Sequence, residues 1–335
     1  MGTLFKDKRA LFYFFIPIAF VYVVWFLYMR VEQQWGLFIH NWFMSLTMIF
    51  GSFVAGASSE GGGAIAYPVM TLVFNITPEV ARNFSLAIQS IGMTAATLWI
   101  LGKRITIEKT YLLLSGLGGL FGVILGTIWI APFVPAAYAK MMFVSFWLSF
   151  GIALFVINHI RNRGTRRLLP DLSQSQKTEL ILIGIVGGIL SAIFGNGIDI
   201  CTFSFVTLKY GLSEKVATPT SVVLMTSNAI LGTLMHFFLI GDMQPEAINY
   251  WLVCIPLVVI GAPFGAYTVN KINRISIAVM LYIIILAQFV AALFIIRPSG
   301  PLMIVSVITF FVGIVLFFFL TSSHDDLQMQ MASEE

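Results

Sequence analysis

Two short segments of this 335-residue chain combine glycines with polar and acidic side chains. They read Gly56-Ala57-Ser58-Ser59-Glu60-Gly61-Gly62-Gly63 and Gly195-Asn196-Gly197-Ile198-Asp199. We expect each glycine-rich segment to interrupt a helix. Such a break exposes backbone N–H groups at the start of the next helix, where the positive end of the helix dipole favours an anion. The segments therefore predict an anion site that contains Ser58, Ser59, Gly61, Gly62, Gly63, Asn196 and Gly197, with a positive φ at Gly62. The alternative is that the glycines only permit close helix packing.

A polar stripe follows each break. Arg82, Ser85 and Gln89 share one face of a predicted helix, and the helix after the second break carries Thr220 and Ser221. A guanidinium can clamp an oxyanion through two N–H donors. Equally, Arg82 stands at the start of its span, where it could reach the interface or pair with Glu79. Both interpretations stay open.

The acidic residues at the breaks, Glu60 and Asp199, are candidates for binding a coupling proton, because carboxylates at membrane depth are costly. The alternative is that either one reaches water at the tip of a hairpin. Sodium coupling stays open as well. The two cysteines lie in apolar stretches without a Cys/His cluster, so no metal site is expected.

A serine-protease pattern competes with the binding interpretation. The first four residues of the first break fit the loose G-x-S-x motif, and His236 lies in a later span where a base could sit. An enzyme needs no duplicate of its nucleophile loop, so we expect neither enzymatic activity nor catalytic residues. His236 is expected near the outer end of its helix, facing lipid headgroups.

The composition determines the class of protein that must position these residues. The chain is 59% hydrophobic and only 10% charged, whereas a soluble protein has about 25% charged residues, so a polytopic, all-α membrane protein is predicted. The net charge of +4 comes from short loops and does not indicate nucleic-acid binding. No nucleotide-binding loop is found, and no cofactor is expected.

Apolar runs predict the membrane spans. Two runs, 64–74 and 200–208, are too short to cross alone and are expected to form half-helices or hairpin arms. The longer runs are 11–29, 37–57, 83–101, 111–134, 141–157, 180–194, 217–240, 247–269, 275–296 and 302–320. Arginines crowd the loop 159–177, which places this loop and both termini in the cytoplasm.

The chain also matches itself at a shift of 136 residues. Each copy has one paired break and three full spans, so the number of crossings is odd and the second copy is inverted. Inverted repeats with broken helices are typical of secondary transporters. The matched pairs are Gly51 with Gly187, Gly61 with Gly197, Thr71 with Thr207, Ser85 with Ser221, and Thr97 with Thr233.

These duplicated segments, together with Thr77-Pro78-Glu79-Val80-Ala81 and Glu214-Lys215-Val216-Ala217-Thr218-Pro219-Thr220-Ser221, resemble the sulfite exporter TauE/SafE family over about 45–296. The resemblance implies transport of sulfite, thiosulfate or an organosulfonate. The second glycine cluster is reduced to Gly195-Asn196-Gly197, and Arg82-Asn83-Phe84 replaces small residues that are usual in the family.

We therefore expect a secondary transporter of small sulfur-containing anions in the cytoplasmic membrane, with an anion channel as the alternative. Its partners are the anion, the lipid bilayer and a proton or sodium ion, and a homodimer stays open. The expected organisation is an N-terminal span and loop (1–36), a first repeat (37–158), a basic cytoplasmic loop (159–179), a second repeat (180–296), a C-terminal span (297–321) and an acidic cytoplasmic tail (322–335).

Overall fold

The computed structural model describes residues 8–59, 61–160 and 164–332, and its regular elements in these ranges are helices. The helices are α1 Lys8–Val31, α2 Leu37–His40, α3 Trp42–Ala57, α4 Gly63–Pro68, α5 Pro78–Gly102, α6 Lys109–Leu125, α7 Ala136–Phe155, α8 Gln174–Phe194, α9 Ile198–Lys209, α10 Glu214–Leu234, α11 Pro245–Lys271, α12 Arg274–Ile296 and α13 Pro301–Ala332. Single π-helical turns extend four elements: Val69–Val73 follows α4, Gly126–Ile130 follows α6, Val156–Ile160 follows α7, and Met235–Leu239 follows α10.

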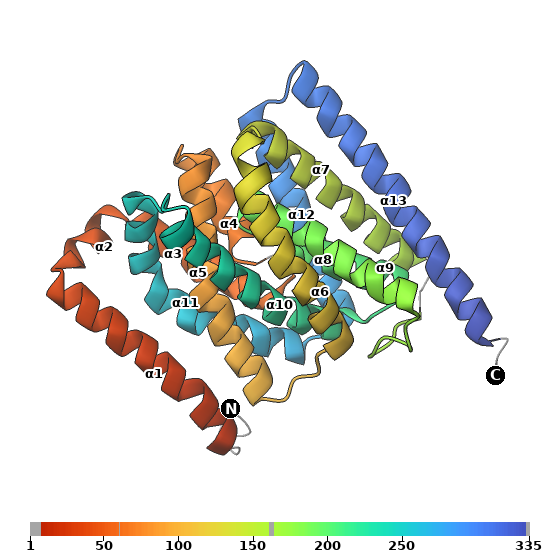
Figure 1. Cartoon of the computed structure of the whole chain (residues 1–335), viewed down its shortest axis with the longest axis horizontal. Helices are drawn as coiled ribbons and strands as arrows, with labels where there is room; N and C mark the ends of the chain where they lie inside the picture. The colour runs from red at the N-terminus through yellow and green to blue at the C-terminus, as the bar shows by residue number, and fades with distance from the viewer. Residues whose placement is uncertain (1–7, 60, 161–163, 333–335) are drawn as a thin grey trace.

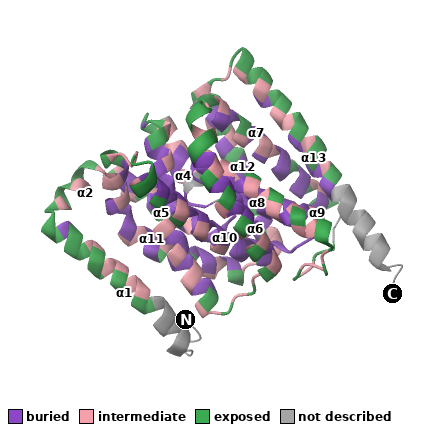
Figure 2. Cartoon of the chain, viewed as in Figure 1, coloured by how far each residue is buried: buried purple, intermediate pink, exposed green. Residues whose placement is uncertain are grey.

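The predicted class, an all-helical polytopic membrane protein, is confirmed. In the described ranges, eight helices are long and apolar enough to cross a membrane, or nine if one bent pair counts as a span. That pair, Phe15–Val31 with Gln34–His40, is bent by 106°. Figure 1 shows α1 and α13 at opposite edges of the molecule, and Figure 2 shows their largely exposed outer faces, as expected for lipid-facing helices.

Two predicted boundaries were wrong. The run 37–57 is not one segment, because Asn41 leaves the helical conformation and separates α2 from α3. The second wrong boundary is the start of α8. This helix begins at Gln174, inside the stretch predicted as a loop. Ser173 and Gln176 form a capping box there, which stabilises an earlier helix start than hydropathy alone indicates.

Both short segments are arms of hairpins. The rings of Phe43 at the start of α3 and Phe74 after α4 are 4.2 Å apart, so the two ends of the first hairpin lie together. In the second hairpin, Lys209 at the end of α9 pairs with Glu179 near the start of α8 at 2.5 Å. In both hairpins, α3–α4 and α8–α9, the two ends therefore lie next to each other.

Small residues let the hairpins pack closely on long helices. Helix α8 runs along α6, and α3 runs along α11. A Cβ atom at Gly122 would overlap the carbonyl of Ile185 on α8, and one at Gly265 would overlap the carbonyl of Phe53 on α3. Gly122 and Gly265 thus permit close contacts between these helices.

Candidate functional site

The tips of the two hairpins meet at the middle of α5. The side chain of Gln89 donates a hydrogen bond from Nε2 to the carbonyl oxygen of Gly195, at 2.7 Å. On the other side, Gly61 is so close to Gln89 Oε1 that a Cβ atom there would collide with it, and that Cβ atom would be 3.1 Å from Asp199 Oδ2. Gln89 therefore joins residues from both breaks.

The backbone at the first tip differs from the prediction in one detail. Gly61 has φ +63°, whereas Gly62 has φ −69° and lies in the right-handed helical region. The positive φ expected at Gly62 was therefore wrong by one position. Gly63 begins α4, and Glu60 lies outside the described residues.

At the second tip, Asp199 uses the backbone donors that were predicted for an anion. Its Oδ1 atom accepts hydrogen bonds from Gly197 N at 3.2 Å and Ile200 N at 3.0 Å. The remaining N–H group, of Ile198, donates to Ser191 Oγ at 2.9 Å. The Asp199 carboxyl group therefore takes the position at the start of α9 that a bound anion would otherwise occupy.

Several buried polar atoms near the tips have no hydrogen-bond partner within the described part of the chain. They are Ser59 Oγ, Ser85 Oγ and Gln89 Oε1, each on a side chain that is at most 1% exposed. A buried polar atom without a partner is costly, and such atoms mark places where a ligand or water can bind.

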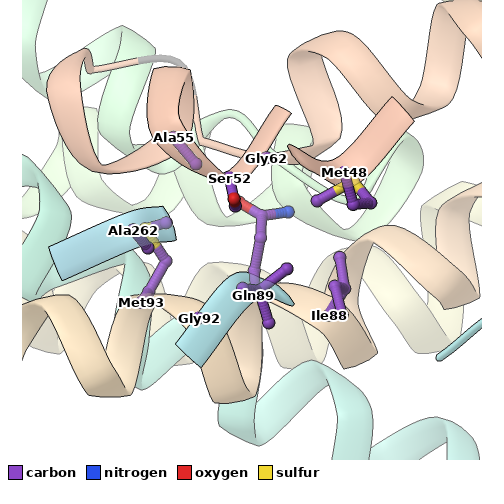
Figure 3. Close-up of a pocket in the computed structure, with 10 residues that line it drawn as sticks. Met48, Ser52, Ala55, Gly62, Ile88, Gln89, Gly92, Met93 and Ala262 are labelled. Atoms are coloured by element: carbon purple, nitrogen blue, oxygen red, sulfur yellow. The ribbon is translucent and has the colours of Figure 1, made fainter. Parts of the chain in front are cut away.

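A small cavity of about 10 Å³ adjoins Gln89, which is room for about one water molecule. Figure 3 shows the Gln89 side chain extending from α5 toward Ser52 and Gly62, with Met93 and Ala262 beside it. The meeting point of the tips is therefore closed to any larger ligand in this conformation.

Arg82 does not point to the tips. Its Nη2 atom pairs with Asp242 Oδ2 at 3.1 Å, and the same carboxylate contacts His236 Nδ1 at 2.6 Å. The structure thus provides an ion pair for Arg82, with Asp242 instead of the Glu79 partner considered above. The placement of His236 against headgroups was wrong, because this side chain is only 2% exposed and lies in the Arg82–Asp242 cluster.

The remaining predicted hydroxyls serve the helices themselves. Thr220 Oγ1 accepts a hydrogen bond from Glu108 N at 2.9 Å and donates one to Val216 O at 2.7 Å. Ser221 donates to Thr218 O at 2.9 Å, and Ser58 donates to Val54 O at 2.9 Å. Neither Thr220 nor Ser221, the predicted polar stripe on α10, forms one of these hydrogen bonds with the hairpin tips.

Lys140 was missed by the sequence analysis. It lies on α7, is only 6% exposed, and donates from Nζ to Thr71 Oγ1 at 2.7 Å. Because the predicted span began at 141, this lysine looked like an ordinary interfacial residue. Pro135 followed by small residues was the available signal, since a helix start at Ala136 places Lys140 a full turn inside the helix.

A bundle of membrane-spanning helices with two hairpins that meet inside it is the architecture of a membrane transporter. The family model of the sulfite exporter TauE/SafE matches residues 44–292, so the chain belongs to this family. The resemblance found over about 45–296 is thereby confirmed, and the protein is a transporter and not an enzyme. Neither the comparison with curated proteins nor that with solved structures gave a match.

Proposed function

We propose that the protein is a secondary transporter that moves a small sulfur-containing anion, such as sulfite, thiosulfate or an organosulfonate, by alternating access. The observation behind the proposal is the meeting of both hairpin tips at Gln89, where the adjoining cavity measures only about 10 Å³. A carrier closes around its site between openings, whereas a conducting channel needs a continuous path. The sulfur chemistry of the substrate rests on family membership.

The arrangement of helices supports an inverted repeat. The 136-residue shift matches α3 with α8, and α11 corresponds to α6 at a slightly larger shift. In the structure, α3 packs on α11 while α8 packs on α6. Each hairpin thus packs on a long helix of the other half. Such reciprocal packing is expected for two repeats related by a two-fold axis in the membrane plane.

The helices that follow the two hairpins, α5 and α10, begin at opposite ends of the helix bundle. Near the start of α5, Asn83 Nδ2 donates to Gln244 Oε1 at 3.0 Å, which places this end beside the 240–245 loop. At the start of α10, Ser213 N donates to Arg166 O at 2.8 Å, beside the basic loop. With that loop in the cytoplasm, both termini are cytoplasmic, although 161–163 lie outside the described residues.

This topology has a direct test. Single cysteines in place of Asn162 and Gln244 are expected to react with a membrane-impermeant reagent from opposite sides of the cytoplasmic membrane. Labelling of both from outside intact cells would reject the inverted arrangement. A cysteine in place of Gln174, close to the basic loop in sequence, is the matched control and should behave like the cysteine at 162.

Asp199 is the residue that we propose for ion coupling. It is 1% exposed, and it forms no ion pair within the described residues. A buried carboxylate that can bind and release a proton would link transport to the proton gradient. Glu60, in the first break, stays a second candidate.

The function is tested by flux in proteoliposomes. Radiolabelled sulfite, thiosulfate and isethionate are offered to vesicles with and without the purified protein, over a range of concentrations. Saturable uptake of at least one anion, with competition by the others, is expected of a carrier. Uptake that does not saturate identifies a channel, and the absence of flux for all sulfur anions rejects the proposed substrate class.

A further inference from the structure

The buried ammonium group of Lys140 lies against the first hairpin. Its Nζ atom donates to Thr71 Oγ1 at 2.7 Å and stands 5.2 Å from the centre of the Tyr67 ring. Lys140 is 6% exposed and Tyr67 is also 6% exposed, so neither side chain reaches bulk water to any extent. The charge is therefore held inside the protein and not at the membrane surface.

No carboxylate balances this charge. Within the part of the chain that the structure describes, the ion pairs involve Arg82, Lys209, His236 and Arg274 but not Lys140. A hydroxyl and an aromatic ring solvate an ammonium group only partly, and an isolated buried charge is costly unless a counter-charge is supplied. A bound anion would supply this counter-charge.

The same lysine lines a cavity that both hairpins build. Tyr67 and Pro68 contribute from the first hairpin, Asn196 from the tip of the second, and Gln288 from α12. Amide groups and a phenol are neutral hydrogen-bonding groups suited to oxyanion recognition. The cavity has a volume of about 20 Å³, so it is closed nearly completely in this conformation.

One wall of the cavity is continuous with a π-helical turn. Pro68 ends α4, and the chain continues through the π-helical turn Val69–Val73, which contains the Thr71 hydroxyl bound by Lys140. Single π-helical turns within helices are frequent at functional sites. Movement of this turn would enlarge the space beside Lys140.

We propose that Lys140, with Tyr67, Asn196 and Gln288, forms the site that binds the negatively charged oxygens of the transported anion. This inference rests on the proposed function and adds to it the position of the anion. The positive charge lies on α7, outside the polar stripes of α5 and α10. Asp199 already occupies the backbone N–H groups of Gly197 and Ile200 at the second tip, so those donors are not open to the anion.

Purified full-length protein tests the inference by ligand titration. The variant Lys140→Met removes the charge and keeps the length of the side chain, and Thr71→Val removes the hydroxyl that holds the ammonium group. Lys271→Met is the matched control, because Lys271 also stands over a tyrosine ring, at 5.7 Å from the centre of Tyr267, but is exposed. The probes are sulfite, thiosulfate, isethionate, acetate and chloride.

Loss of the charge is expected to weaken binding of the preferred probe by about tenfold or more, while Lys271→Met stays within about twofold of wild type. Thr71→Val should weaken binding less than Lys140→Met does. A monodisperse Lys140→Met protein that binds the probe as wild type does overturns the inference. So does a variant that loses transport but retains binding, because that result would give Lys140 a role in conformational change or proton movement.

The two proposals fail in different ways. If wild type transports a sulfur anion and Lys140→Met binds it normally, the proposed function stands and the site is wrong. If wild type binds only acetate or chloride, and this binding needs Lys140, the anion site stands and the substrate class is wrong.

Discussion

The two hairpin tips have corresponding sequences but differ in how their polar groups are satisfied. At the second tip, Asp199 accepts hydrogen bonds from Gly197 N and Ile200 N, and Ser191 accepts one from Ile198 N. At the first tip, Ser59 Oγ has no partner among the described residues. The backbone donors of the second tip are thus satisfied by its own side chains, whereas the first tip retains unused hydrogen-bonding capacity.

The carboxylates also occupy different positions in the two tips. At the 136-residue shift, Asn196 corresponds to Glu60, and Asp199 corresponds to Gly63. The duplication therefore preserves the backbone break but not the charge pattern. Together with Lys140 beside the first hairpin, this difference is the reason why we propose anion binding in one half and ion coupling in the other. Two breaks of similar backbone structure can therefore carry different charged groups.

The largest effect is expected from Gly61→Ala. A left-handed φ costs a non-glycine residue about 1–2 kcal/mol, and the added Cβ atom would collide with Gln89 Oε1. We expect a clear fall in melting temperature and loss of flux. Gly62→Ala is the control, because φ is −69° there and the nearest atom to an added Cβ is Met48 Cε at 3.4 Å. Equal damage from both substitutions would show that the first tip has no special requirement at Gly61.

An intermediate effect is expected from Asp199→Asn. An amide oxygen can still accept from Gly197 N and Ile200 N, but it is neutral, so roughly 1 kcal/mol of stability should be lost. Flux should no longer respond to an imposed pH gradient, because an amide binds no proton near neutral pH. The measurement is uptake in proteoliposomes with and without that gradient. Retained acceleration by the gradient would remove Asp199 from proton coupling.

The smallest effect on ligand binding is expected from Arg82→Lys. Because Arg82 is paired with Asp242, replacement by lysine should change stability by about 1 kcal/mol or less and leave anion affinity unchanged. Titration of the purified variant with the preferred anion provides the measurement. A strong loss of affinity with normal folding would instead make Arg82 a direct anion ligand and would shift the site toward the end of α5.

Hydropathy and local glycine content were sufficient to predict the class of protein, most of the spans and both breaks. These features depend on residues that are neighbours in the chain, since a span requires a continuous apolar run and a break requires local backbone freedom. The same locality explains the two errors in helix boundaries. A departure at Asn41 and a capping box at Ser173 concern single turns, which average hydropathy does not resolve.

Which side chains lie together at the candidate site depends on tertiary structure. Gln89 reaches Gly195 across 106 positions of sequence, and Arg82 finds Asp242 across 160 positions. Lys140 resembles an interfacial lysine in the sequence and becomes a buried cation only because α7 packs beside Thr71 and Tyr67 of the first hairpin. The sequence by itself determined where the chain crosses the membrane and where it breaks. Only helix packing decided which charges are paired, because burial and ion pairing depend on residues that folding brings together from distant parts of the chain.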